Sequence, residues 1–108
     1  MRFLIVFLFA CGCAGRFSRT DVVMQGGVAT VLVLDYLQTR QITVDGLESN
    51  PIMGSRGERM PPVVYFPSVL AVHTLVMMLL PGEWRTATQI GTVAVQVKAV
   101  RHNRTHGY

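Results

Sequence analysis

The stretch that decides the fold reads MPPVVYFPSVLAVHTLVMMLL and covers residues 60–80. It carries no formal charge except on His73 when that side chain is protonated, and as a helix it is long enough to cross the hydrocarbon core of a bilayer. Pro67 would kink such a helix or shift its start, and Pro81 with the following glycine ends it. The pattern predicts a transmembrane helix over 61–80.

A second apolar run lies upstream of this stretch. Residues 22–34 carry no charge before Asp35, and continuation to residue 44 gives a helix of membrane-spanning length. Gly26 and Gly27 would weaken a soluble helix, whereas in a membrane helix they allow a neighbour to approach closely. We therefore predict a helix over 21–44. The candidate N-cap residues are Ser18, Thr20 and Asp21.

The C-terminal segment is ambiguous between helix and strand. Valines alternate with small or polar residues over 93–98, which is the period of a strand, but Ile90, Ala94 and Val97 also form a helical stripe with room for close packing, which favours a helix. We predict a helix over 84–102. Trp84 and Arg85 at its start are expected to form an interfacial anchor, with the indole at headgroup depth. The predicted fold class is all-α, a small bundle of two or three transmembrane helices.

The composition favours a membrane protein and excludes several other classes. Half of the 108 residues are hydrophobic and only 15% are charged, below the share of about 25% in ordinary soluble domains. The net charge of +4 comes from basic residues scattered around apolar segments, whereas a nucleic-acid binder clusters them. We expect membrane lipid as a partner, with another membrane protein or a second copy beside it. We predict no cofactor, metal or nucleic acid.

The N-terminus has the layout of a secretory signal. One basic residue precedes an apolar run over 3–10, and small residues follow. The Gly-Cys sequence ending at Cys13 matches a lipoprotein signal, and Cys11 is the alternative lipidation site. The prediction is a signal peptide over 1–12 and one helical membrane domain over 13–108. Such a protein resides in the bacterial cell envelope, in the inner membrane, with its lipid anchor on the periplasmic side.

Polar residues form a cassette between the two apolar runs. One interpretation places its carboxylates near the inner interface, where they cap helices, pair with Arg40 or Arg56 and hold a loop. The alternative is an ion- or proton-handling or hydrolytic site built on Asp35, Glu48 and His73, which requires these three groups to share one cavity. The residues of the predicted polar motif are Asp35, Gln38, Thr39, Glu48, Asn50, Pro51 and Gly54.

The cassette also carries a family resemblance. Its Asp-x-x-Gln-Thr and Glu-x-Asn-Pro-x-x-Gly elements, followed by Tyr65-Phe66, resemble a group of small, uncharacterised membrane proteins of proteobacteria and their phages and prophages. The resemblance implies no activity that transfers to this chain. Two departures matter: Gln96 stands where an acidic residue is expected, and Lys98 with Ala99 stands where small residues are expected. These changes count against a carboxylate-based activity of the third helix.

Three functional hypotheses remain at this level. The first is a non-enzymatic envelope protein that acts by binding other membrane components. The second is the intramembrane ion-handling or hydrolytic protein described above. The third is a holin-like, pore-forming oligomer. The third hypothesis rests on a face of small residues in the first helix, formed by Gly26, Gly27, Ala29 and Thr30.

Overall fold

The computed structural model describes residues 17–108, and these residues form three α-helices and no strand. The helices are α2 (Arg19–Val44), α3 (Pro62–Leu79) and α4 (Gly82–Thr105). The predicted all-helical class is confirmed, and the ambiguous C-terminal segment is a helix.

The predictions for the N-terminus fall outside this part of the chain. The signal peptide over 1–12 and the lipidation sites Cys13 and Cys11 lie outside the described residues. They therefore stay predictions.

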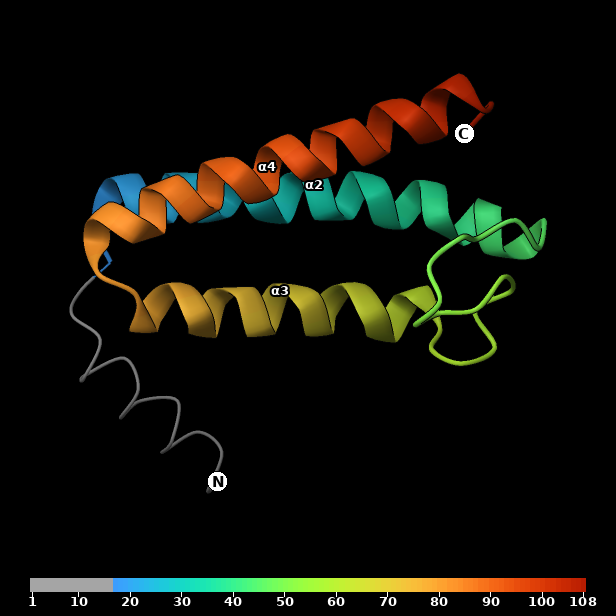
Figure 1. The fold of residues 1–108 in the computed structure, drawn as a ribbon, viewed down its shortest axis with the longest axis horizontal. Coiled ribbons are helices and arrows are strands. Elements are labelled where there is room, and N and C mark those ends of the chain that lie inside the picture. Colours follow the sequence, from blue (N-terminus) through green and yellow to red (C-terminus); the bar gives the residue numbers. More distant parts are fainter. Residues whose placement is uncertain (1–16) are drawn as a thin grey trace.

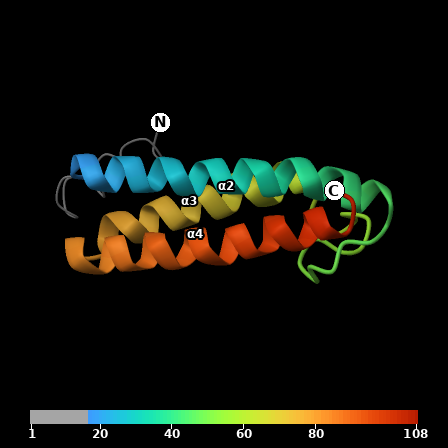
Figure 2. The same ribbon diagram turned by 90° about the horizontal axis from the view of Figure 1, so that it is seen from above.

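The three helices run up, down and up, with α2 in contact with both of the others. Figures 1 and 2 show α2 and α4 side by side and pointing the same way, with α3 antiparallel to them. A short turn at Pro81 joins α3 to α4, whereas the loop over 45–61 joins α2 to α3. The parallel pair of α2 and α4 therefore brings residues more than sixty positions apart in sequence into contact.

Local sequence explains where each helix begins. Ser18 and Asp21 form a capping box at the start of α2: the Asp21 amide donates to the Ser18 hydroxyl at 3.1 Å, and the Ser18 amide donates to the Asp21 carboxylate at 2.9 Å. Pro62 occupies the first turn of α3, where its missing N–H is not needed. Pro67 lies inside α3, and the helix begins before it and continues past it.

The distribution of side chains differs from that of a soluble domain. Buried hydrophobic residues are few, and the cluster around Val28, Leu32, Met53 and Phe66 is small. Buried polar side chains of the described residues are nearly as numerous: Asp21, Thr39, Thr43, Arg85 and Gln89. Large hydrophobic side chains, by contrast, are exposed along all three helices. The bundle is therefore polar along much of its interior and apolar over much of its surface.

Helices α2 and α3 are each long and apolar enough to cross a membrane. Only 17% of the most apolar window of α2 and 11% of that of α3 is buried within the bundle. A core helix of a soluble protein would be mostly buried, so these low shares agree with exposure to lipid. Helix α4 is not apolar enough to be a candidate membrane span. The third predicted segment is therefore a helix, but its composition does not support a transmembrane position.

Candidate functional site

The polar cassette lines an open cavity of about 460 Å³ at the loop end of the bundle. Helix α2 and the loop supply one wall, α4 supplies another, and the first turns of α3 complete the lining. The cassette residues in the lining are Asp35, Thr39, Glu48 and Asn50. The fold therefore brings both halves of the predicted motif to one place, which we call the cassette cavity.

The Asp-x-x-Gln-Thr element fastens α2 to the end of α4. Asp35 Oδ1 accepts hydrogen bonds from Thr39 Oγ1 and from Asn103 Nδ2, both at 3.2 Å. Asn103 Nδ2 also donates to Gln38 Oε1 at 3.1 Å, and Gln38 Nε2 donates to the Val100 carbonyl at 3.3 Å. Spacings of three and four residues place these groups on one face of α2. The element thus has a structural role in addition to lining the cavity.

The Glu-x-Asn-Pro-x-x-Gly element shapes the loop. Glu48 Oε1 accepts from the Asn50 amide at 2.9 Å, and Asn50 Oδ1 accepts from the Ile52 amide at 2.9 Å. The Gly54 amide donates to the Asn50 carbonyl at 3.0 Å, closing a turn around Pro51. Gly54 has a φ of +81°, a conformation that favours glycine. The motif therefore specifies a tight loop that points the Glu48 side chain at the cavity.

The carboxylates of the cavity have no cationic partner within the described part of the chain. The ion pairs expected with Arg40 and Arg56 are not formed: Arg40 lies over the Tyr36 ring, 5.8 Å from its centroid. Asp35 and Glu48 are close enough to interact electrostatically. Repulsion between them is therefore not neutralised by the arginines that sequence reasoning had selected.

A buried amide adds an unsatisfied acceptor to the cavity lining. Gln96 Oε1 is buried and has no hydrogen-bond partner. An unpaired buried carbonyl costs roughly 1–3 kcal/mol. Gln96 lies on α4 and shares the lining of this cavity with Asp35 and Glu48.

A second polar cluster lies toward the other end of the bundle. Arg85 pairs with Asp21 at 3.2 Å, and Gln89 Nε2 donates both to the Asp21 carbonyl at 3.2 Å and to Gln25 Oε1 at 3.0 Å. Gln25 Nε2 lies 3.1 Å from His73 Nδ1, and His73 Nε2 lies 3.0 Å from Thr92 Oγ1. This cluster joins all three helices. His73 is thus a hydrogen-bonded bridge between helices.

The structure does not bring His73 to the two carboxylates. His73 contacts Gln25, and ten residues separate Gln25 from Asp35 along α2, a rise of about 15 Å. One hydrogen bond and one bridging water span far less than that. A hydrolytic site that combines Asp35, Glu48 and His73 is therefore not assembled in this bundle.

Trp84 and Arg85 point in different directions. Trp84 is exposed, as an interfacial anchor requires, but Arg85 is only 5% exposed. Its guanidinium donates to the Met77 carbonyl at 2.7 Å and to the Asp21 carboxylate. Arg85 therefore differs from the expected surface anchor, because the last carbonyls of α3 and the acidic first turn of α2 draw it inward.

Three residues of α4 in the lining were not among the predicted site residues: Lys98, His102 and Asn103. At the other end of the bundle, the ion pair between Arg85 and Asp21 was likewise not predicted. The sequence signal for the α4 residues is the spacing of polar side chains at three and four positions along that helix. Among residues 17–108, no group of three or more His, Cys, Asp or Glu side chains is arranged to hold a metal ion.

Comparisons with protein-family models, with curated proteins and with solved structures gave no match to this chain. The functional proposals below therefore rest on the geometry of the bundle and on its sequence.

Proposed function

We propose that this chain is a small helical protein of a bacterial cell-envelope membrane, bacterial or phage-encoded, that acts without chemical turnover by associating with other membrane components. The observation that carries the proposal is the distribution of side chains: many large apolar groups lie outside, and polar groups are nearly as numerous inside as hydrophobic ones. Water would oppose such a surface, whereas lipid favours it. Two candidate spans with little buried surface support the same conclusion.

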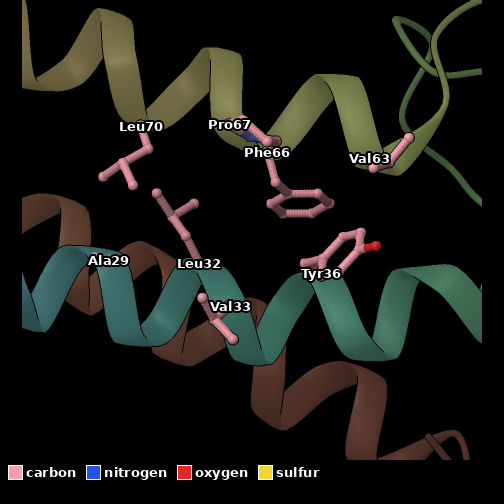
Figure 3. A pocket seen from close by; sticks show the side chains of 8 residues that line it. All are labelled: Ala29, Leu32, Val33, Tyr36, Val63, Phe66, Pro67 and Leu70. Atoms are coloured by element: carbon pink, nitrogen blue, oxygen red, sulfur yellow. The ribbon is translucent and has the colours of Figure 1, made fainter.

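An apolar groove between α2 and α3 fits a lipid environment. It has a volume of about 260 Å³, and Figure 3 shows its aliphatic and aromatic lining. The Tyr36 and Phe66 rings meet edge to face across it, with centroids 5.8 Å apart. Such a concave apolar surface is costly in water and neutral in hydrocarbon. The groove lining is Ala29, Leu32, Val33, Tyr36, Val63, Phe66, Pro67 and Leu70.

The outward face of α2 offers room for a neighbouring helix. A side chain added at Gly26 or Gly27 would meet no atom within 4 Å, so neither glycine is used for packing among the described residues. Small residues let membrane helices approach closely. We infer that the two glycines allow a helix of another membrane protein, or of a second copy, to pack closely against α2.

Fractionation of cells that express the tagged chain tests membrane residence. We expect the protein to remain in membranes washed with sodium carbonate and to require detergent for release. Recovery in the soluble fraction would overturn the proposal. The pore hypothesis predicts loss of membrane potential on expression, and that outcome would replace association as the function.

Variants of the cassette separate association from catalysis. We expect Asp35→Ala and Glu48→Ala to change assembly or abundance, because both side chains hold backbone or neighbouring side chains in place. Loss of a measurable reaction from a well-folded variant would contradict a non-enzymatic role. Glu83→Ala is the matched control, since this exposed carboxylate lies at the opposite end of α4.

A further inference from the structure

The cassette cavity holds opposite charges that do not pair with each other. Asp35 and Glu48 lie on the wall made by α2 and the loop, and Lys98 and His102 lie on the α4 wall. A spacing of four residues puts Lys98 and His102 on one face of α4. No ion pair crosses this cavity. A ligand that carries a positive and a negative group would complement both walls at once.

Acceptor atoms on the acidic side are left without hydrogen-bond donors. Asp35 uses Oδ1 for its two side-chain bonds, and Glu48 uses Oε1 for its bond to the loop, which leaves Oδ2 and Oε2. These two oxygens can accept hydrogen bonds from a cation that bears N–H groups, and such a cation would also offset the negative charge of the two carboxylates.

The cavity lies near the ends of both candidate spans. Asp35 is followed by Tyr36, whose ring contacts Phe66 within the first two turns of α3. Basic residues are frequent at this end of the bundle, in the loop and at the end of α4. If α2 and α3 cross a bilayer, the cavity opens at the depth of the lipid headgroups.

We propose that the cassette cavity binds the headgroup of a zwitterionic phospholipid that carries a primary ammonium, phosphoethanolamine. Its ammonium lies at Asp35 and Glu48, and its phosphate faces Lys98 and His102. This inference rests on the proposed membrane residence. A primary ammonium has three N–H donors for the free oxygens, whereas a choline headgroup has none. A glycerol headgroup lacks the positive charge.

Lipid binding to the purified full chain tests the assignment. The chain is delipidated in detergent and titrated with phosphatidylethanolamine, phosphatidylcholine and phosphatidylglycerol of identical acyl chains, with the bound fraction read by native mass spectrometry. We expect phosphatidylethanolamine to bind about tenfold more tightly than either of the others, because only its ammonium makes charge-assisted hydrogen bonds to the acidic wall. Equal binding of all three lipids overturns the inference.

Matched variants locate the binding. Glu48→Gln keeps an acceptor for the Asn50 amide but removes the charge, so the loop is retained while the preference for phosphatidylethanolamine falls about tenfold. Lys98→Gln weakens phosphate contact and lowers binding of this lipid too. Glu83→Gln and Arg101→Gln change the same charges away from the cavity lining, and both are expected to bind as the parent does. An unchanged preference in Glu48→Gln refutes the site.

Two further experiments are needed. One distinguishes lipid from soluble phosphoethanolamine, and the other distinguishes this inference from the proposed membrane residence. Soluble phosphoethanolamine at millimolar concentration is expected to compete with the lipid; if it binds while vesicles of phosphatidylethanolamine do not, the lipid assignment is overturned. Flotation with vesicles of phosphatidylcholine alone reports membrane residence without this headgroup. Failure to float contradicts the proposed function, whereas flotation without headgroup preference contradicts only this inference.

Discussion

Replacement of Arg85 by methionine removes the group that holds the three helices together at one end. Arg85 Nη1 lies 3.2 Å from Asp21 Oδ2, and its Nε donates to the Met77 carbonyl at 2.7 Å. Methionine keeps much of the apolar stem and loses the charge. The variant leaves the Asp21 carboxylate, which is 4% exposed, without its counter-charge, and leaves a carbonyl in the last turn of α3 without its donor.

The expected loss in the free energy of unfolding is about 3 kcal/mol. Breaking a buried ion pair by removing one partner costs roughly 3–5 kcal/mol, since the remaining charge is left uncompensated. We take the lower end because Asp21 keeps its hydrogen bond from the Ser18 amide at 2.9 Å, and because the pair lies at the end of the bundle.

Unfolding in mixed micelles of mild detergent and increasing sodium dodecyl sulfate measures this loss. A double-mutant cycle with Asp21→Asn isolates the pair, and we expect a coupling of about 1–3 kcal/mol, with the double variant less damaged than the sum of the singles. Arg101→Met is the control, an exposed arginine of the same helix whose loss is expected to stay within about 0.5 kcal/mol. A loss below about 1 kcal/mol for Arg85→Met, together with additive effects of the Arg85 and Asp21 substitutions, would refute the conclusion that this ion pair stabilises the packing of the helices.

Three smaller perturbations test other parts of the bundle. Gly54→Ala forces a side chain into a positive-φ turn, with its Cβ 2.5 Å from the Glu58 carboxyl carbon, and should destabilise the chain by about 1–3 kcal/mol in the same unfolding assay. The Glu58 carboxylate accepts hydrogen bonds from its own backbone N–H and from that of Arg56, and these bonds lower the pKa of its carboxyl. The carboxylate therefore stabilises the folded loop fully above the ordinary pKa of a glutamate, and this contribution is lost as the pH falls through the lowered pKa. Hydrogen exchange at the Arg56 amide, corrected for intrinsic rate, should lose protection over that acidic range in the parent and stay unprotected in Glu58→Gln. Gln89→Leu removes the donor to Gln25 Oε1 and to the Asp21 carbonyl, but it also removes the buried Gln89 Oε1, which has no hydrogen-bond partner. The net loss in the same unfolding assay should be about 1 kcal/mol, and a stability equal to or above that of the parent would show that the amide contributes nothing.

The long uncharged stretches of the sequence were enough to predict the candidate membrane spans, but they did not predict which residues lie inside the bundle. Helix α3 follows the uncharged stretch almost from end to end, because in such a stretch only a helix satisfies its own backbone groups. The position of Arg85 was not predictable in this way. Its direction depends on the turn at Pro81, which brings it back onto the last carbonyls of α3.

The two short motifs of the cassette predict local structure but only part of the site. Spacing within Asp-x-x-Gln-Thr predicts one helical face, and Asn-Pro predicts a turn, and both features are present. Neither motif specifies what lies opposite. Lys98 and His102 reach the cavity because α4 runs parallel to α2, and that pairing is set by contacts more than sixty positions apart. His73 failed to join the carboxylates for the same reason, since its height on α3 fixes its partners.

The pairing of α2 with α4 nevertheless has a signal in the sequence, which is the spacing of the residues that face the other helices. The α2 positions that face the other helices recur at alternating spacings of four and three, and so do the α4 positions that meet them: Asp21, Gln25, Val28, Leu32, Asp35, Thr39 and Ile42 on α2, with Arg85, Gln89, Thr92, Gln96, Ala99 and Asn103 on α4. This is the heptad period of two helices that pack along their whole length. A search for apolar periodicity misses it, because polar residues occupy several of these positions while large hydrophobic residues are also exposed on the surface. In this bundle polar and hydrophobic residues together mark the interior, so the same period applied to both kinds of residue predicts the pairing of α2 with α4.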